Sequence, residues 1–102
     1  RWRLLAAIRI SGTDAAAVRR EAGRVCDECG RIVAGRQLGL TILGPVPAPI
    51  ERIRDRHRFQ VLIKAERRKD IFDLLAAARL VGGAGRYGSV AISVDIDPMD
   101  ML

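Results

Sequence analysis

The stretch RFQVLIK, residues 58–64, decides how the chain folds. Its apolar residues Phe59, Val61 and Ile63 alternate with polar neighbours, and a period of two is typical of a β-strand with one buried face. We therefore expect a strand that turns its apolar side toward a core and its basic side away from it.

Helical spacing follows this strand. Ile71, Leu74, Leu75 and Ala78 recur at intervals of three and four, which predicts a helix over residues 67–81. The glycine-rich segment 82–88 then ends the helix.

A proline-rich segment precedes the strand. Residues 40–43 form a short apolar run, and residues 44–49 read GPVPAP. Prolines lack a backbone donor and are rare in strand interiors, so we expect a second strand that ends at residue 43.

The two ends of the chain add two more strands and a helix. Alternation over residues 2–11 predicts a first strand, and Asp14 is placed to cap a helix that ends near Gly35. Alternation over residues 90–96 predicts a last strand, which stops before Pro98. The order βαββαβ predicts an α+β ferredoxin-like sandwich, a four-stranded antiparallel sheet with two helices on one face.

Composition narrows the class of protein. A chain of 102 residues with one such pattern predicts a single domain over residues 1–102, and no stretch is apolar for long enough to cross a bilayer. The chain opens with Arg1 rather than Met, so we expect it to be a fragment of a longer protein. Two cysteines without others suit a reducing cytoplasm.

Three short motifs have plain structural interpretations. The GxGxxG at residues 83–88 follows a helix and leads into a strand, the reverse of a dinucleotide site, so we interpret it as a flexible connection. Cys26 and Cys29 have the spacing of zinc ligands but too few companions, which favours buried or half-buried thiols over metal or redox chemistry. Asp95 and Asp97 share one side of a strand, where a structural role, either neutralising nearby arginines or capping the chain end, is favoured over an acid–base or metal site.

An enzyme of the acylphosphatase type would share this fold. Such an enzyme needs an amide side chain to orient its attacking water, and the sequence contains no Asn. The two amides, Gln37 and Gln60, lie outside any glycine-rich phosphate cradle. We therefore predict no catalytic residues.

Most of the net charge of +6 lies between residues 51 and 69, where eight basic residues face three acidic ones. In an extended chain, Arg52, Arg54, Arg56 and Arg58 would share one side and form a charged ribbon. Arginine forks bind phosphate oxygens in pairs, which favours nucleic acid as the partner. A solvated arginine-rich loop with Phe59 in the core is the alternative, and for Phe59 the core is favoured.

Three segments also match a known family. Residues 44–50, GPVPAPI, residues 56–64, RHRFQVLIK, preceded by Arg54, and residues 94–98, VDIDP, resemble the C-terminal domain of primosomal protein N′, the PriA replication-restart DNA helicases. The resemblance covers essentially the whole chain. The rings of His57 and Phe59 could stack on unpaired bases. His57 stands where the family usually has an aromatic ring, which puts stacking at that position in question.

The resemblance implies a function for the chain. Domains of this family are similar in fold to a small-subunit ribosomal protein, help recognise branched DNA at stalled forks and contact single-strand DNA-binding protein. The ATPase motor and the zinc module lie upstream, so the resemblance implies no ATP, zinc or other cofactor in this chain. It implies a bacterial cytoplasmic protein whose partners are branched or single-stranded DNA, single-strand DNA-binding protein, the upstream helicase domains and other primosome proteins, without a membrane.

Two hypotheses about the basic residues follow. In the first, phosphates are contacted by Arg52, Arg54, Arg56, His57, Arg58, Lys64, Arg67, Arg68 and Lys69. In the second, a sheet face with Leu5, Ala7 and Leu62 docks on the helicase core while the arginines receive the acidic tail of single-strand DNA-binding protein. Both remain open at this stage.

Overall fold

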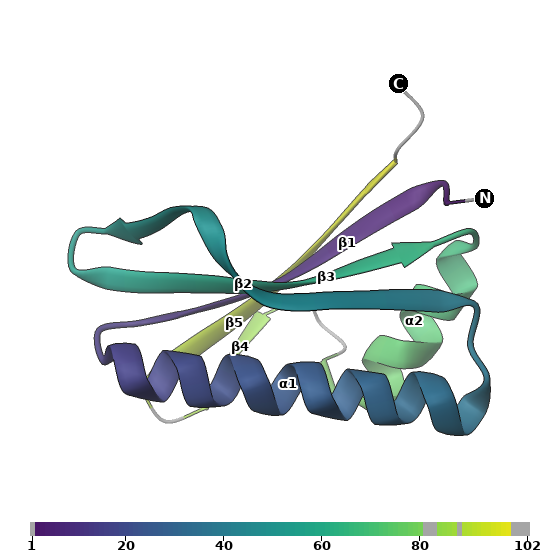
Figure 1. The fold of residues 1–102 in the computed structure, drawn as a ribbon, viewed down its shortest axis with the longest axis horizontal. Coiled ribbons are helices and arrows are strands. Elements are labelled where there is room, and N and C mark those ends of the chain that lie inside the picture. The colour runs from purple at the N-terminus through teal and green to yellow at the C-terminus, as the bar shows by residue number, and fades with distance from the viewer. Residues whose placement is uncertain (1, 81–83, 88, 99–102) are drawn as a thin grey trace.

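The computed structural model describes residues 2–80, 84–87 and 89–98. In this part of the chain the elements follow the order β-α-β-β-α-β-β (Figure 1). Their bounds are β1 (Leu4–Gly12), α1 (Ala15–Arg36), β2 (Leu40–Ile53), β3 (Arg56–Ala65), α2 (Arg68–Ala77), β4 (Ala84–Tyr87) and β5 (Val90–Pro98).

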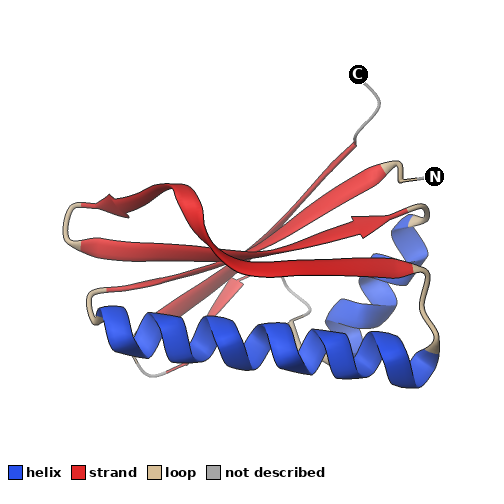
Figure 2. Ribbon diagram, in the orientation of Figure 1, coloured by secondary structure: helices blue, strands red, loops and turns tan. Residues whose placement is uncertain are grey.

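The strands form one antiparallel sheet in the order β2-β3-β1-β5-β4. Figure 2 shows both helices on one face of this sheet, with neither of them covering the other face. The centre of the sheet holds the first and third strands of the chain, as a ferredoxin-like fold requires. The predicted α+β sandwich is confirmed, with the short strand β4 added at the edge beside β5.

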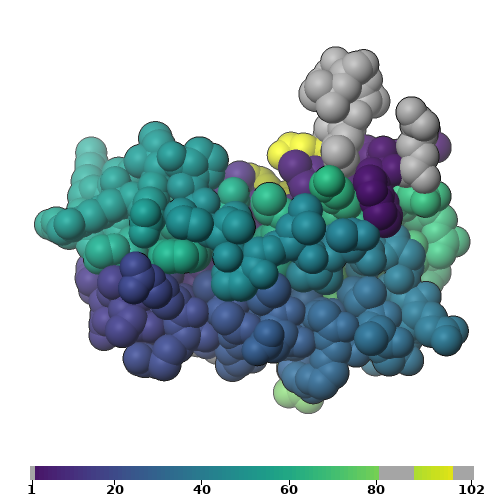
Figure 3. Space-filling model, in the orientation of Figure 1, coloured from purple at the N-terminus to yellow at the C-terminus, as the bar shows by residue number. Residues whose placement is uncertain are grey.

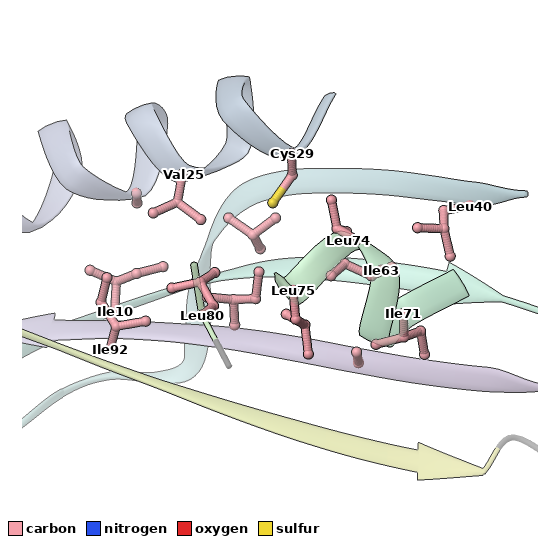
Figure 4. Close-up of a cluster of buried hydrophobic side chains, with 14 of the residues drawn as sticks. Ile10, Val25, Cys29, Leu40, Ile63, Ile71, Leu74, Leu75, Leu80 and Ile92 are labelled. Atoms are coloured by element: carbon pink, nitrogen blue, oxygen red, sulfur yellow. The ribbon is translucent and has the colours of Figure 1, made fainter. Parts of the chain in front are cut away.

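The hydrophobic core fills the layer between the sheet and the helices (Figure 4). Ile8, Ile10 and Ile63 of the central strands are fully buried there. Val18 of α1 and Leu74 of α2 meet them from the helical side and are also fully buried. Burying one such side chain contributes about 1.5–3 kcal/mol, so this layer holds the helices to the sheet.

The first helix begins and ends where its sequence predicts. The Asp14 carboxylate accepts hydrogen bonds from the backbone N–H groups of Ala16, at 3.0 Å, and Ala17, at 3.3 Å. These bonds satisfy donors that have no partner within the helix. At the other end, Gln37 adopts a left-handed conformation with φ 53°, which turns the chain toward β2.

The second strand does not stop at the prolines, so that prediction is wrong. β2 runs through them to Ile53 and pairs with β3 over most of its length. The reason is its position at the edge of the sheet, where prolines are tolerated at bulges and on the unpaired side. The pairing shifts register between Leu43 and Val46 and again between Pro47 and Arg52. Gly44, with φ 115°, lies at the first of these bulges.

Two predictions near the end of the chain also need correction. α2 ends at Ala77, earlier than predicted, because Arg79 turns left-handed with φ 61° and Leu80 donates its N–H to the carbonyl of Leu75 at 2.7 Å. In the glycine-rich segment, residues 84–87 form β4 instead of a flexible connection, since the exposed edge of β5 offers them backbone partners. The rest of residues 81–88 lies outside the described residues.

Candidate nucleic-acid interface

The arginine-rich segment folds as the turn of the β2–β3 hairpin and not as an extended ribbon. Arg54 and Asp55 form the two-residue turn, with φ values of 51° and 64°. Positive φ at both central residues is what a type I′ turn requires, and such turns match the twist of the strands they join. The prediction that the four arginines at 52–58 share one side is therefore wrong.

The register of the hairpin sorts its cations between two faces. Residues paired across an antiparallel ladder point to the same side of the sheet. Arg52 pairs with His57, which lies in phase with the buried Val61 on the helix side. Ile53 pairs with Arg56, which lies in phase with Arg58 on the open side. Arg54 stands at the apex between them.

On the open side, Arg56 and Arg58 are held by neutral groups of the protein. The Arg56 guanidinium donates to Ser11 Oγ at 3.0 Å, and the Arg58 guanidinium donates to the carbonyl of Ile50 at 3.0 Å. Each guanidinium carries five N–H donors, so these contacts position the groups and leave donors for a ligand. Both charges therefore remain available to an anion.

The acidic pair of the last strand behaves as a structural element. Asp95 forms an ion pair with Arg9 of β1 on the open side of the sheet. The favoured structural interpretation is confirmed for Asp95, which neutralises an arginine. Because Asp95 neutralises the charge of Arg9, Arg9 is not among the candidate anion-binding residues.

On the helix side, an arginine of α1 contacts the hairpin strand β3. The Arg19 guanidinium lies over the Phe59 ring, with Cζ 5.8 Å from the ring centroid. Phe59 is partly buried and packs against the core, as predicted. Arg52 on the same side forms an ion pair with Asp55 at 2.8 Å, but both side chains are more than half exposed, so this pair is weak.

Two candidate residues, Arg19 and Arg20, were missed by the sequence analysis. Both are exposed, and among the described residues neither forms an ion pair with a carboxylate. Gly12, which pairs with His57, lies against Val18, so the start of α1 is beside the hairpin. Figure 3 shows the atoms of the hairpin directly above the first turns of α1 at one end of the molecule. We call this region the basic end; it contains Arg19, Arg20, Arg52, Arg54, Arg56, His57 and Arg58.

The remaining predicted contacts lie elsewhere. β3 carries the chain away from the hairpin by about 3.3 Å per residue, so Arg67, Arg68 and Lys69 begin α2 about 30 Å from Arg56. Arg67 pairs with Asp70, and Lys69 pairs with Asp73 at 2.7 Å. Lys64 projects from the open face between the two groups. The nine predicted residues thus do not form one site.

The two thiols fit the structural interpretation. Cys29 is fully buried, and Cys26 is half-buried with its Sγ 3.2 Å from the carbonyl oxygen of Gly44. Desolvation raises the pKa of Cys29 to about 11 and also raises the pKa of Cys26. A thiol that resists ionisation is a poor nucleophile and a poor metal ligand. Among the described residues no cluster of three metal-binding side chains occurs.

Comparisons with known proteins agree with this architecture. A family model described as "Primosomal protein N C-terminal domain" matches residues 2–99. A solved structure titled "De novo designed protein Foldit4" superposes with a TM-score of 0.60 at 15% identity, over 93% of this chain and 96% of that one, which shows a shared fold alone. No curated protein matches the chain.

No described helix is long and apolar enough to cross a membrane.

Proposed function

The chain belongs to the family of primosomal protein N C-terminal domains, and from this membership we propose that it is a DNA-binding module of replication restart that holds branched DNA at stalled forks. It acts through phosphate contacts at the basic end. The single observation that carries the proposal is the pair Arg56 and Arg58, both on the open face and both anchored by neutral acceptors.

The geometry of this pair is suited to binding phosphate oxygens. Arg56 and Arg58 lie two residues apart on one strand, about 7 Å along the chain, and present planar forks to one side. Contacts with backbone phosphates depend on salt and carry no sequence information. Such a module would recognise the shape of a branched substrate and not its base sequence.

The chain has a positioning role in this proposal and no catalytic one. The ATP-dependent motor and the zinc module would belong to upstream domains of the same polypeptide, in the bacterial cytoplasm. Single-strand DNA-binding protein and other primosome proteins are the expected partners. The chain's own residues would fix where the motor meets the fork.

A titration of labelled DNA tests the proposal. Arg56→Gln combined with Arg58→Gln should weaken binding to a forked DNA by more than about tenfold at low salt, because charged hydrogen bonds are lost. A matched control with the same change in charge is Arg31→Gln with Arg36→Gln, far from the hairpin on α1, which should bind almost as tightly as the wild type. An unchanged affinity of the Arg56 and Arg58 variant for forked DNA would show that these two arginines do not bind it.

A second candidate function, protein docking, is favoured by the apolar residues of the open face. Leu43, Leu62 and Ala7 form one row across three adjacent strands, because Leu62 pairs with both of the others. Leu5 lies two residues from Ala7 on the same face, and Leu43 is 38% exposed. A partner such as the upstream helicase core would cover Leu5, Leu43 and Leu62 of this face, where Ala7 is already buried, while the arginines received the acidic tail of single-strand DNA-binding protein.

Titration with that acidic tail peptide separates the two functions. If the chain binds the peptide and no DNA at low salt, docking is the main role and the arginines serve a protein. If forked DNA binds and the peptide does not, the arginines serve phosphate. Binding of both, with competition between them, would show that DNA and the acidic tail share one surface.

A further inference from the structure

We propose that the β2–β3 hairpin inserts at the branch point of a forked DNA, with its opposite faces contacting the phosphates of two different arms. This inference rests on the proposed function and specifies how its site meets the substrate. It is carried by the sorting of cations between the two faces, by the conformation of the apex and by the apolar residues beside it.

Both faces of the hairpin carry arginine, although an extended chain would have placed Arg52, Arg56 and Arg58 on one side. Arg56 and Arg58 point to the open side, whereas Arg52 and His57 point to the helix side. The start of α1 extends the helix-side surface with Arg19, whose guanidinium is stacked on Phe59. Two arms of a fork, one on each side of the hairpin, would therefore both meet basic side chains. A DNA on only one side would leave the basic side chains of the other side unused.

The apex carries a cation in a conformation that disfavours it. Arg54 has φ 51° and Asp55 has φ 64°, a region that Asn and Gly adopt far more readily than Arg. An Asn-Gly pair would form the same turn with less strain, so folding alone does not require an arginine there. Strain at an exposed charged apex is typical of a position with a binding role.

Apolar side chains accompany the cations at the tip. Ile50 is 58% exposed and Ile53 is 41% exposed, and both lie on the last part of β2 before the turn. Where DNA branches, the base stack ends and an unstacked base pair offers an apolar face. Proteins that kink or open DNA place aliphatic side chains against such faces. A hairpin with aliphatic residues flanked by arginines on both sides fits a branch point better than a continuous duplex.

Two hairpin variants, each with two substitutions, test the inference on three DNAs, namely a fork, a linear duplex and a single strand. Arg56→Gln with Arg58→Gln removes the two guanidinium groups of the open side, and Arg52→Gln with His57→Gln removes the guanidinium and the imidazole of the helix side. Each variant should lower affinity for the fork by at least about tenfold. The helix-side variant should leave affinity for the duplex nearly unchanged, since one arm reaches one side of the hairpin.

The outcomes separate failure of the inference from failure of the proposed function. If the helix-side variant binds the fork normally, or weakens fork and duplex equally, the hairpin contacts one backbone and the inference is wrong while DNA binding stands. If the wild type binds none of the three DNAs, or the open-side variant binds all of them normally, the proposed function is wrong and the inference with it.

The apex gives a test that does not depend on lost stability. Glycine adopts a positive φ without strain, so in Arg54→Gly the hairpin should remain folded, with an unchanged or higher melting temperature. Because the substitution also removes the cation, the variant should bind the fork more weakly. The matched control is Asp55→Gly, which relieves the same strain at the neighbouring position and removes an anion. It should bind the fork at least as tightly as the wild type. Equal fork affinity for Arg54→Gly and the wild type would exclude the apex from the contact.

Discussion

Arg67 reaches across the first turn of α2 to Asp70, with Nη2 3.0 Å from Oδ1 and Nε 3.3 Å from Oδ2. The Asp70 side chain is 6% exposed, whereas that of Arg67 is 70% exposed. The pair therefore supplies a buried carboxylate with a charged partner at the start of the helix. This geometry gives Arg67 a structural task, and its predicted contact with DNA stays a prediction.

Removing Arg67 should accordingly affect stability and not DNA binding. Arg67→Ala leaves the buried Asp70 carboxylate without its partner, so the free energy of unfolding should fall by about 1–3 kcal/mol. Urea unfolding measures this loss, and a fork titration should give nearly the wild-type affinity. Arg68→Ala, in the same turn and exposed, is the control and should leave the unfolding curve in place. A large loss of fork affinity in Arg67→Ala would return Arg67 to the binding site.

The arginines at the start of α1 should contribute to the salt dependence of DNA binding. Each phosphate contact that is lost reduces the slope of log affinity against log salt by about 1. Arg19→Gln with Arg20→Gln should therefore reduce the slope by about 1–2. Anisotropy titrations at four or more salt concentrations give the slope, and Arg31→Gln with Arg36→Gln is the charge-matched control. Equal slopes in the two double variants would place DNA away from the start of α1.

The buried thiol of Cys29 should make stability depend on alkaline pH. Burial is the largest cause of its raised pKa, Cys26 and Glu28 raise the pKa further, and Arg24 opposes them. Between the unperturbed value of 9.0 and the folded value of about 11, the unfolded chain loses its proton while the folded chain keeps it. The contribution of Cys29 to the free energy of unfolding should therefore be constant below pH 9 and fall by about 2–3 kcal/mol up to pH 11.

Urea unfolding from pH 7 to pH 11 checks this dependence. Other groups titrate in the same range, so the measurement is the difference between the wild type and Cys29→Ala. The variant is less stable at pH 7 because it leaves a cavity, but it should lose less stability as the pH rises. Parallel curves for the two proteins would contradict the assigned pKa.

Much of the fold follows from local sequence. The alternation around Phe59, the cap at Asp14 and the helical spacing of Ile71 and Leu74 each determine their element through nearby residues. Fold class could be predicted because four strands and two helices in this order have few ways to cover one core. The continuation of β2 could not, because prolines are tolerated only where a strand lies at an edge, and position in the sheet is a property of the whole fold.

The candidate site was predicted in part for the same reason. Arg56 and Arg58 lie on the open face because alternation along β3 continues through them. The reversal at Arg54 lacks the Asn-Gly signal of a type I′ turn, so the sequence indicated an extended ribbon. Arg19 comes close to the hairpin only through the antiparallel pairing of β1 with β3, which the predicted fold implied but the basic segment did not suggest.

Two glycines of similar appearance in the sequence should respond to alanine in opposite ways. Gly44 has φ 115°, and a Cβ there would lie 3.1 Å from the carbonyl oxygen of Gln60 and from the backbone nitrogen of Val46. Gly44→Ala must therefore strain the bulge that β2 needs, and the free energy of unfolding should fall by about 1–3 kcal/mol. Gly30 lies inside α1, where a Cβ would meet nothing within 4 Å.

Gly30→Ala should for this reason raise the free energy of unfolding by about 0.5–1 kcal/mol, since alanine loses less conformational freedom in a helix. Urea unfolding of both variants beside the wild type gives the two signs in one experiment. Because Gly44 lies in the strand that carries the hairpin, Gly44→Ala should also weaken fork binding, whereas Gly30→Ala should not. A Gly44→Ala protein as stable as the wild type would show that β2 passes the prolines without the bulge.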